Sequence, residues 1–230
     1  MAIIAIPSRG PKNWRQAQAD PERQWKPGTA AVCLALSWEA AEGEFPAEIS
    51  RIIRGASFID LAGLHPLLII PGFAVPWPDG RMKDQLHLLT LCQGTYGLCP
   101  MAVEAVAYDD FGPGISEYQG NGDPGRSTEL RFLKETLGIG EIPGGIRYHL
   151  VRRFVSTIFL AKRFGARQAV LLMHAFTREN RWFDDFANLL ALFNAGVRPG
   201  TLAVLDSIPD IRLFAGWCTG NPDLTRVDIR

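Results

Sequence analysis

The sequence lacks a long apolar run of the kind that a membrane-spanning helix requires. Its longest apolar stretch, around residues 154–161, has basic residues on both sides, whereas a span needs about 18 or more apolar residues. Residues 1–7 are apolar but no basic region precedes them, so they do not resemble a signal peptide. We therefore expect a cytoplasmic protein with no membrane partner.

The sequence also lacks an excess of charge of either sign. It contains 24 basic and 24 acidic side chains, which gives a formal net charge of zero. Proteins that bind nucleic acid are usually basic on at least one face. Neutrality therefore argues against strong non-specific DNA binding, although it allows a local basic patch.

Cysteine is scarce, and the four cysteines do not form a metal-binding pattern. There is no C-x-x-C pair and no histidine at zinc-finger spacing. We expect buried free thiols in a reducing compartment. A disulfide between Cys92 and Cys99, which can face each other across a hairpin, is the minor alternative.

Several common catalytic signatures are missing as well. The sequence has no G-x-S-x-G elbow, P-loop, H-E-x-x-H motif or Rossmann fingerprint at a strand–helix junction. The glycine-rich segment 112–125 is separated from the next helix by irregular sequence. We interpret it as a flap or partner-contact loop rather than a phosphate-binding loop.

The composition that remains is that of one globular domain. Apolar residues make up 47% of 230 residues, enough to bury a sizeable core. Residues 1–28 are predicted to form an irregular N-terminal arm. We expect Trp14 and Trp25 to pack this arm against the rest of the domain. Residues 29–230 predict a single α/β domain.

Apolar periodicity and capping residues locate the expected elements. We expect helices at 29–41, 46–53, 128–137, 146–164 and 182–193, with Thr29 and Ser127 as N-caps. We expect strands at 67–70, 86–91, 101–107, 169–173, 202–205 and 213–217. This order predicts a mixed central sheet with helices on both faces and a right-handed crossover into strand 169–173.

The order of helix, three strands, helix and strand is also that of the PD-(D/E)xK nucleases. In that fold an Asp on the second strand and the acid of the third-strand triplet hold a divalent cation, usually Mg²⁺. Here Asp84 begins the second predicted strand and Glu104 lies within the third. The triplet reads Glu104-Ala105-Val106, so the lysine that would orient water is absent.

A more specific resemblance extends over residues 14–217. It rests on Trp25-Lys26-Pro27-Gly28, Ser37-Trp38-Glu39-Ala40-Ala41, Phe111-Gly112-Pro113, Ile146-Arg147-Tyr148, His174-Ala175-Phe176 and Arg181-Trp182-Phe183. With these segments the chain resembles an uncharacterised bacterial family that looks like a remote PD-(D/E)xK relative.

The resemblance implies a restriction-endonuclease-like αβββαβ core. It also implies an acidic second-strand residue and an E-x-K triplet before the Phe-Gly of the long loop. In the most natural register Gln85, rather than Asp84, occupies the acidic position, and Val106 replaces the lysine. We therefore expect impaired catalysis and a role in binding nucleic acid or protein.

The alternative is a residual Mg²⁺-dependent nuclease or phosphodiesterase. Asp84 and Glu104 would bind the metal, and Lys83, Arg126 or His149 would replace the lost lysine. A third possibility is an α/β domain whose pocket lies elsewhere along the sheet edge.

Three further residues have a functional and a structural interpretation. Glu39 is either a third site carboxylate or a solvated helix residue. His149 either reaches the site from the start of its helix or is a helix-terminal donor. His174 lies at a strand end, where functional groups collect, but a lone histidine there is more often structural.

Overall fold

A computed structural model of the chain describes residues 3–4, 10–78, 83–120, 122–206, 208 and 210–228, and of residues 3–4 the backbone only. The helices are the 3₁₀ helices η1 (Pro11–Ala17), η2 (Ile59–Leu61) and η3 (Pro222–Arg226), and α1 (Pro21–Gln24), α2 (Ala30–Glu39), α3 (Ala47–Gly55), α4 (Ile115–Gln119), α5 (Pro124–Leu137), α6 (Tyr148–Arg163) and α7 (Phe183–Ala191). The strands are β1 (Ile3–Ile4), β2 (His65–Pro71), β3 (Ala74–Pro76), β4 (Lys83–Gln85), β5 (Leu88–Gly94), β6 (Gly97–Val106), β7 (Gln168–Ala175), β8 (Leu202–Leu205) and β9 (Arg212–Thr219).

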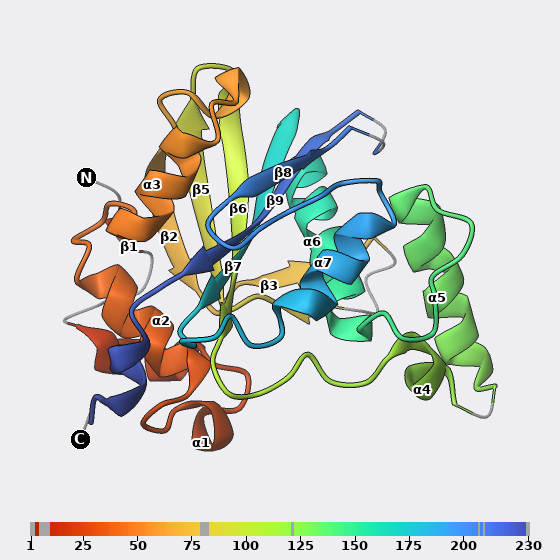
Figure 1. Cartoon of the computed structure of the whole chain (residues 1–230), viewed down its shortest axis with the longest axis horizontal. Coiled ribbons are helices and arrows are strands. Elements are labelled where there is room, and N and C mark those ends of the chain that lie inside the picture. The colour runs from red at the N-terminus through yellow and green to blue at the C-terminus, as the bar shows by residue number, and fades with distance from the viewer. Residues whose placement is uncertain are drawn as a thin grey trace.

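A mixed seven-stranded sheet in the order β1-β2-β5-β6-β7-β9-β8 forms the centre of the molecule (Figure 1). Strands β2, β5 and β6 form an antiparallel meander. The chain then crosses through α5 and α6 to β7, which runs parallel to β6, and β9 runs parallel to β7. The predicted mixed α/β fold with helices flanking a central sheet is confirmed.

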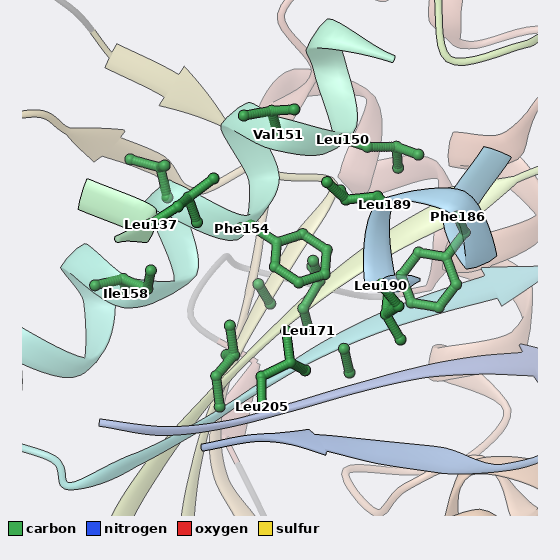
Figure 2. Close-up of a cluster of buried hydrophobic side chains, with 14 of the residues drawn as sticks. Leu137, Leu150, Val151, Phe154, Ile158, Leu171, Phe186, Leu189, Leu190 and Leu205 are labelled. Carbon is green, nitrogen blue, oxygen red and sulfur yellow. The ribbon is translucent and has the colours of Figure 1, made fainter. Parts of the chain in front are cut away.

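The two faces of the sheet carry separate apolar cores. Alternate residues of β6 point to opposite faces: Ala102 and Val106 pack in the core with α6, and Met101 and Val103 in the core with α2. Figure 2 shows part of the α6 core, where Phe154 and Leu190 lie over Leu171 of β7. Glu104, between Ala102 and Val106, therefore faces α6.

The N-terminal arm packs on the body, but it is not irregular throughout. It contains η1 and α1, and Trp14 of η1 is fully buried. The Trp14 indole N–H donates to a carboxylate oxygen of Glu39 on α2 at 2.6 Å. Helix α2 is apolar on all sides, because it packs on the sheet and is also contacted by η1 and η3.

The predicted strand 86–91 is wrong in its first part, because the chain forms two separate strands there. Asp84 lies on β4, which pairs only with β3 in a hairpin outside the central sheet. Asp84 and Glu104 are therefore not on adjacent strands. Opposite this break lies a turn at Gly72, whose N–H donates to the carbonyl of His87 at 2.9 Å. Its φ is 62°, and a Cβ atom there would lie 1.8 Å from the carbonyl oxygen of Ala17, so only glycine fits.

The helix after the long loop starts earlier than predicted, and Ser127 is not its cap. The Asp123 carboxylate accepts from the backbone N–H groups of Gly125 and Arg126, and Pro124 occupies the first turn of α5. The loop itself contains the short helix α4.

All four cysteines are free and buried. Cys92 and Cys99 lie directly opposite each other on β5 and β6. Burial raises the pKa of both thiols. Among the described residues, no helix is both long and apolar enough to cross a membrane.

Candidate functional site

Glu104 is a buried carboxylate in the middle of the sheet, with 2% of the residue exposed. Its Oε1 accepts from the backbone N–H of His87 at 3.1 Å and lies 2.9 Å from Nε of Arg153. Its Oε2 lies 2.9 Å from Nδ1 of His87 and 3.8 Å from Nε2 of His149. One carboxylate therefore contacts a guanidinium and two imidazoles.

Arg153 is the basic residue of this site, and it comes from the second turn of α6. The residue is 4% exposed, and its guanidinium forms ion pairs with both Asp84 and Glu104. In the sequence, Arg153 is one of the basic residues that flank the apolar stretch 154–161, and no individual role was predicted for it. The signal that could have singled it out is its phase, because Arg153 lies three residues after Leu150 and seven before Leu160, both in the core.

Asp84 occupies the far side of the same guanidinium. It is 4% exposed, and its Oδ2 accepts from the Ser156 hydroxyl at 2.8 Å. Arg152 lies 3.6 Å from its Oδ1 and 3.9 Å from Glu129, which extends the chain of alternating charges. Thus the hairpin β3–β4, although outside the central sheet, still delivers Asp84 to the Glu104 region.

The two carboxylates stay ionised because of the buried cation between them. Burial alone would raise the pKa of Glu104, but the charges of Arg153 and His87 outweigh it and hold that pKa well below its ordinary value. The same balance, dominated by Arg153, lowers the pKa of Asp84. The carboxylates in turn raise the pKa of Arg153 despite its burial.

The two histidines differ in their surroundings. Nδ1 of His87 lies within hydrogen-bonding distance of Glu104 and also accepts the backbone N–H of Ala105 at 3.2 Å. The amide requires a bare nitrogen and the carboxylate requires an N–H, so only one of these bonds forms at a time. Crowding by protein atoms and the charge of Arg153 lower the pKa of His149, although 39% of its side chain is exposed.

A cleft of about 1060 Å³ opens over this group. Its wall includes the N-terminal arm, the start of α2, the loop after β6 and the start of α6, and its polar floor is formed by Gln85, His87, Glu104, His149 and Arg153. Asp84 does not line the cleft. Gln85 does, and its amide donates to the carbonyls of Ala17 and Gly72 and so holds the arm.

Val106, the third residue of the Glu104-Ala105-Val106 triplet, also lies at the cleft. Val106 shares the face of Glu104, is 2% exposed and lines the cleft. A side chain with a basic head at this position would therefore point toward the same floor. Valine offers no proton and no hydrogen bond to the cleft at this position.

The other candidates make their contacts elsewhere. Glu39 does not line the cleft and accepts the indole N–H of Trp14. Arg126 donates to the carbonyl of Tyr118 at 2.7 Å, and the side chain of Lys83 is exposed. Of the residues proposed to replace the lysine, His149 is the one in contact with Glu104.

No metal-binding cluster accompanies these carboxylates. Within the part of the chain that the structure describes, no group of three or more His, Cys, Asp or Glu side chains could hold a metal ion. Asp84 and Glu104 share a guanidinium instead of an open coordination position.

His174 lies on the opposite face of the sheet and outside the cleft. The ring is fully buried, and its Nε2 lies 3.0 Å from a carboxylate oxygen of Glu48 on α3. No partner for Nδ1 is found among the described residues. A neutral ring with its proton on Nε2 fits both facts, and burial lowers the pKa of His174 accordingly.

Comparison with known proteins gives a family and nothing further. No curated protein and no solved structure matches the chain. The sequence model of a family described as a domain of unknown function, DUF6946, matches residues 7–222. Since this match spans nearly all of the 230 residues, the chain belongs to that family.

Proposed function

We propose that this chain is a binding protein of restriction-endonuclease-like architecture that has lost metal-dependent cleavage. The observation that carries the proposal is the position of Arg153, whose guanidinium pairs with both Asp84 and Glu104. The order α2–β2–β5–β6–α6–β7, with β6 and β7 parallel, is consistent with the αβββαβ core that the resemblance implies.

Arg153 disfavours a metal for electrostatic and geometric reasons. A divalent ion needs oxygen ligands at roughly 2.0–2.6 Å, but Glu104 already lies 2.9 Å from the guanidinium Nε. An entering cation would be repelled by the buried positive charge, and in a medium of low polarity this repulsion is strong. Displacement of Arg153 would in turn leave its charge without a partner.

The charge of the cleft favours a protein partner over a nucleic acid. Among the lining residues, Arg23 and Arg153 supply two positive charges, and Glu104, Asp109 and Asp110 supply three negative ones. The lining therefore carries a net charge of about −1 when its histidines are neutral. Nucleic-acid affinity depends on neutralising phosphates, so this lining suits a polypeptide better.

The test of lost metal chemistry uses the intact protein and its Arg153→Ala variant. We expect the wild type to cleave neither DNA nor RNA with Mg²⁺ or Mn²⁺, and its melting temperature to be unaffected by Mn²⁺. In Arg153→Ala the freed carboxylates should gain Mn²⁺ affinity, so Mn²⁺ should raise the melting temperature of that variant. Arg163→Ala, at the exposed end of α6, is the control and should behave like the wild type.

Two results would overturn the proposal. Metal-dependent cleavage by the wild type that Glu104→Gln abolishes would restore the nuclease. Tight binding of labelled oligonucleotides at physiological salt, lost in Arg23→Gln, would replace the protein partner by a nucleic acid.

The second candidate is a residual Mg²⁺-dependent nuclease or phosphodiesterase. It is favoured by His149, which contacts Glu104 and lines the cleft, and which could take the place of the missing lysine. For this candidate, cleavage would require Mg²⁺ and would be lost in His149→Gln.

A further inference from the structure

A second, smaller pocket lies beside the cleft, on the other side of Tyr108, which lines both. Its volume is about 220 Å³. It is formed by the loop that follows β7 and by η3, which follows β9. These two strands are parallel, and crevices beyond the carboxyl ends of parallel strands are common ligand sites in α/β proteins.

The pocket is lined by more positive than negative side chains. Arg178 and Arg181 come from the first loop and Arg226 from η3, and Glu179 is the one acid among the lining residues that the structure describes. A carboxylate next to the pocket already uses these cations. Asp223 lies 3.0 Å from Nη2 of Arg178 and 4.0 Å from Nη1 of Arg226.

The Asp223 carboxylate shows which kind of group these arginines bind, and it is held only weakly. The Asp223 side chain is 64% exposed, as is that of Arg178, and the Arg226 side chain is 74% exposed. Solvent-exposed ion pairs of this kind contribute little stability. A better-placed oxyanion can therefore take both guanidinium groups from Asp223 at small cost.

A neutral donor is also available at the pocket wall. Thr177 is 6% exposed, and its hydroxyl oxygen accepts the backbone N–H of Arg181 at 3.1 Å. Among the described residues no acceptor is found for the hydroxyl proton itself. This proton can therefore be donated to a ligand oxygen.

The loop that carries these groups is held in an uncommon backbone conformation. Asn180 and Trp182 have φ values of 48° and 70°, in the left-handed region that bulky residues such as Trp rarely adopt. The Asn180 side chain is fixed from β9, since its Oδ1 accepts from the Trp217 indole and the Thr219 hydroxyl. Backbone strain of this kind clusters at ligand-binding segments.

We propose that this pocket binds a phosphate-sized oxyanion, either inorganic phosphate or the phosphate group of a small phosphomonoester. Guanidinium groups bind phosphate oxygens in pairs of parallel hydrogen bonds, which Arg178, Arg181 and Arg226 can supply from two directions. The proposal does not depend on the role of the large cleft, because it uses none of the groups around Glu104.

Calorimetric titration of the full chain at fixed ionic strength tests this site, with inorganic phosphate in one arm and glycerol 2-phosphate in the other. We expect saturable binding of one anion per chain in at least one arm, and the tighter arm identifies the source. Arg178→Gln and Arg226→Gln should each weaken binding about tenfold, as expected for a charge-assisted hydrogen bond. Arg163→Gln should leave it unchanged.

A substitution that strengthens binding provides the sharper test. Asp223→Asn removes the competing carboxylate and should tighten anion binding several-fold. Asp206→Asn is the matched control, because Asp206 is also 64% exposed and 3.0 Å from an arginine, Arg212, outside the pocket. The proposal is overturned if neither anion binds saturably at about 10 mM, or if both Asp variants change the affinity equally.

Discussion

The two faces of the sheet each contain a buried polar side chain on a central strand, but the surroundings of that side chain differ between the faces. On the α6 face, Glu104 belongs to a chain of alternating charges and lies at the floor of an open cleft. On the α2–α3 face, Glu48 is the one hydrogen-bond partner of His174 among the described residues, and the ring has no exposed surface. The difference separates a buried ionic network under an open cleft from a histidine–glutamate pair whose ring is sealed from solvent, on neighbouring strands of one sheet.

The largest expected effect is on the α6 face. Arg153→Met should lower the free energy of unfolding by about 3–5 kcal/mol, because Asp84 and Glu104 would remain buried without their shared cation. Urea unfolding at neutral pH measures this effect. Arg152→Met is the matched control, because the Arg152 side chain is more exposed, at 21%, and lies farther from Asp84, at 3.6 Å. Its loss should therefore be smaller, about 1.5–3 kcal/mol. Equal losses in the two variants would contradict the special role of Arg153.

A smaller loss is expected on the sealed face. Glu48→Ala should cost about 1–3 kcal/mol, because the buried Nε2–H of His174 would lose its acceptor. The measurement is again urea unfolding, with the exposed Glu44→Ala as the control. If Glu48→Ala were neutral while Arg153→Met was severe, polar stabilisation would be confined to the α6 face.

Both faces should contribute to the pH dependence of stability. Burial lowers the pKa values of His174 and His149 in the folded protein. Below about pH 6.5 the unfolded chain therefore binds more protons than the folded chain, and stability falls as the pH falls. The lowered pKa values of Asp84 and Glu104 add a loss of the same sign at more acidic pH.

Thermal unfolding between pH 7.5 and pH 5 provides the measurement. His174→Asn and His149→Asn should each flatten the slope of stability against pH. A slope that depends on neither histidine would show that other groups control acid sensitivity.

The smallest loss of stability is expected at Glu39, a carboxylate that belongs to neither the Glu104 site nor the His174 pair. Glu39→Gln should lower stability by about 0.5–1 kcal/mol, since the Trp14 indole N–H would donate to an amide oxygen instead of a carboxylate. Susceptibility of the N-terminal arm to limited proteolysis should rise, while anion binding at the small pocket should not change. A change in that binding would show that the arm couples to the pocket.

Local pattern was sufficient to predict most of the fold. Apolar periodicity placed the helices now seen as α2 and α6, and the strand β8 was predicted with its observed bounds. Each of these elements can be recognised from its own residues, by the periodicity of the apolar ones and by the Gly, Ser or Thr residues at its ends. The separation of β4 from β5 was not predicted, because no Gly or Pro lies between Gln85 and Leu88 to signal a break.

The candidate site was predictable in its carboxylates and not in its cation. Glu104 followed from the triplet pattern, and His149 from the start of its helix. Arg153 could not be assigned, because its partners come from β4 and β6, and a basic residue on a helix is usually solvated. The absence of a basic residue at Val106 was visible in the sequence, but the cation that neutralises the acids depends on the packing of α6 on the sheet.

The guanidinium between Asp84 and Glu104 has a consequence for how this region responds to its surroundings. The occupancy of a site for a dissociable metal ion depends on the concentration of that ion, and chelators remove the ion. Arg153 is part of the chain, and its pKa is raised, so its charge is present at every physiological pH and in every ionic medium. Under the proposed function, the geometry of the cleft floor is independent of metal supply, and it should be the same in the presence and absence of EDTA.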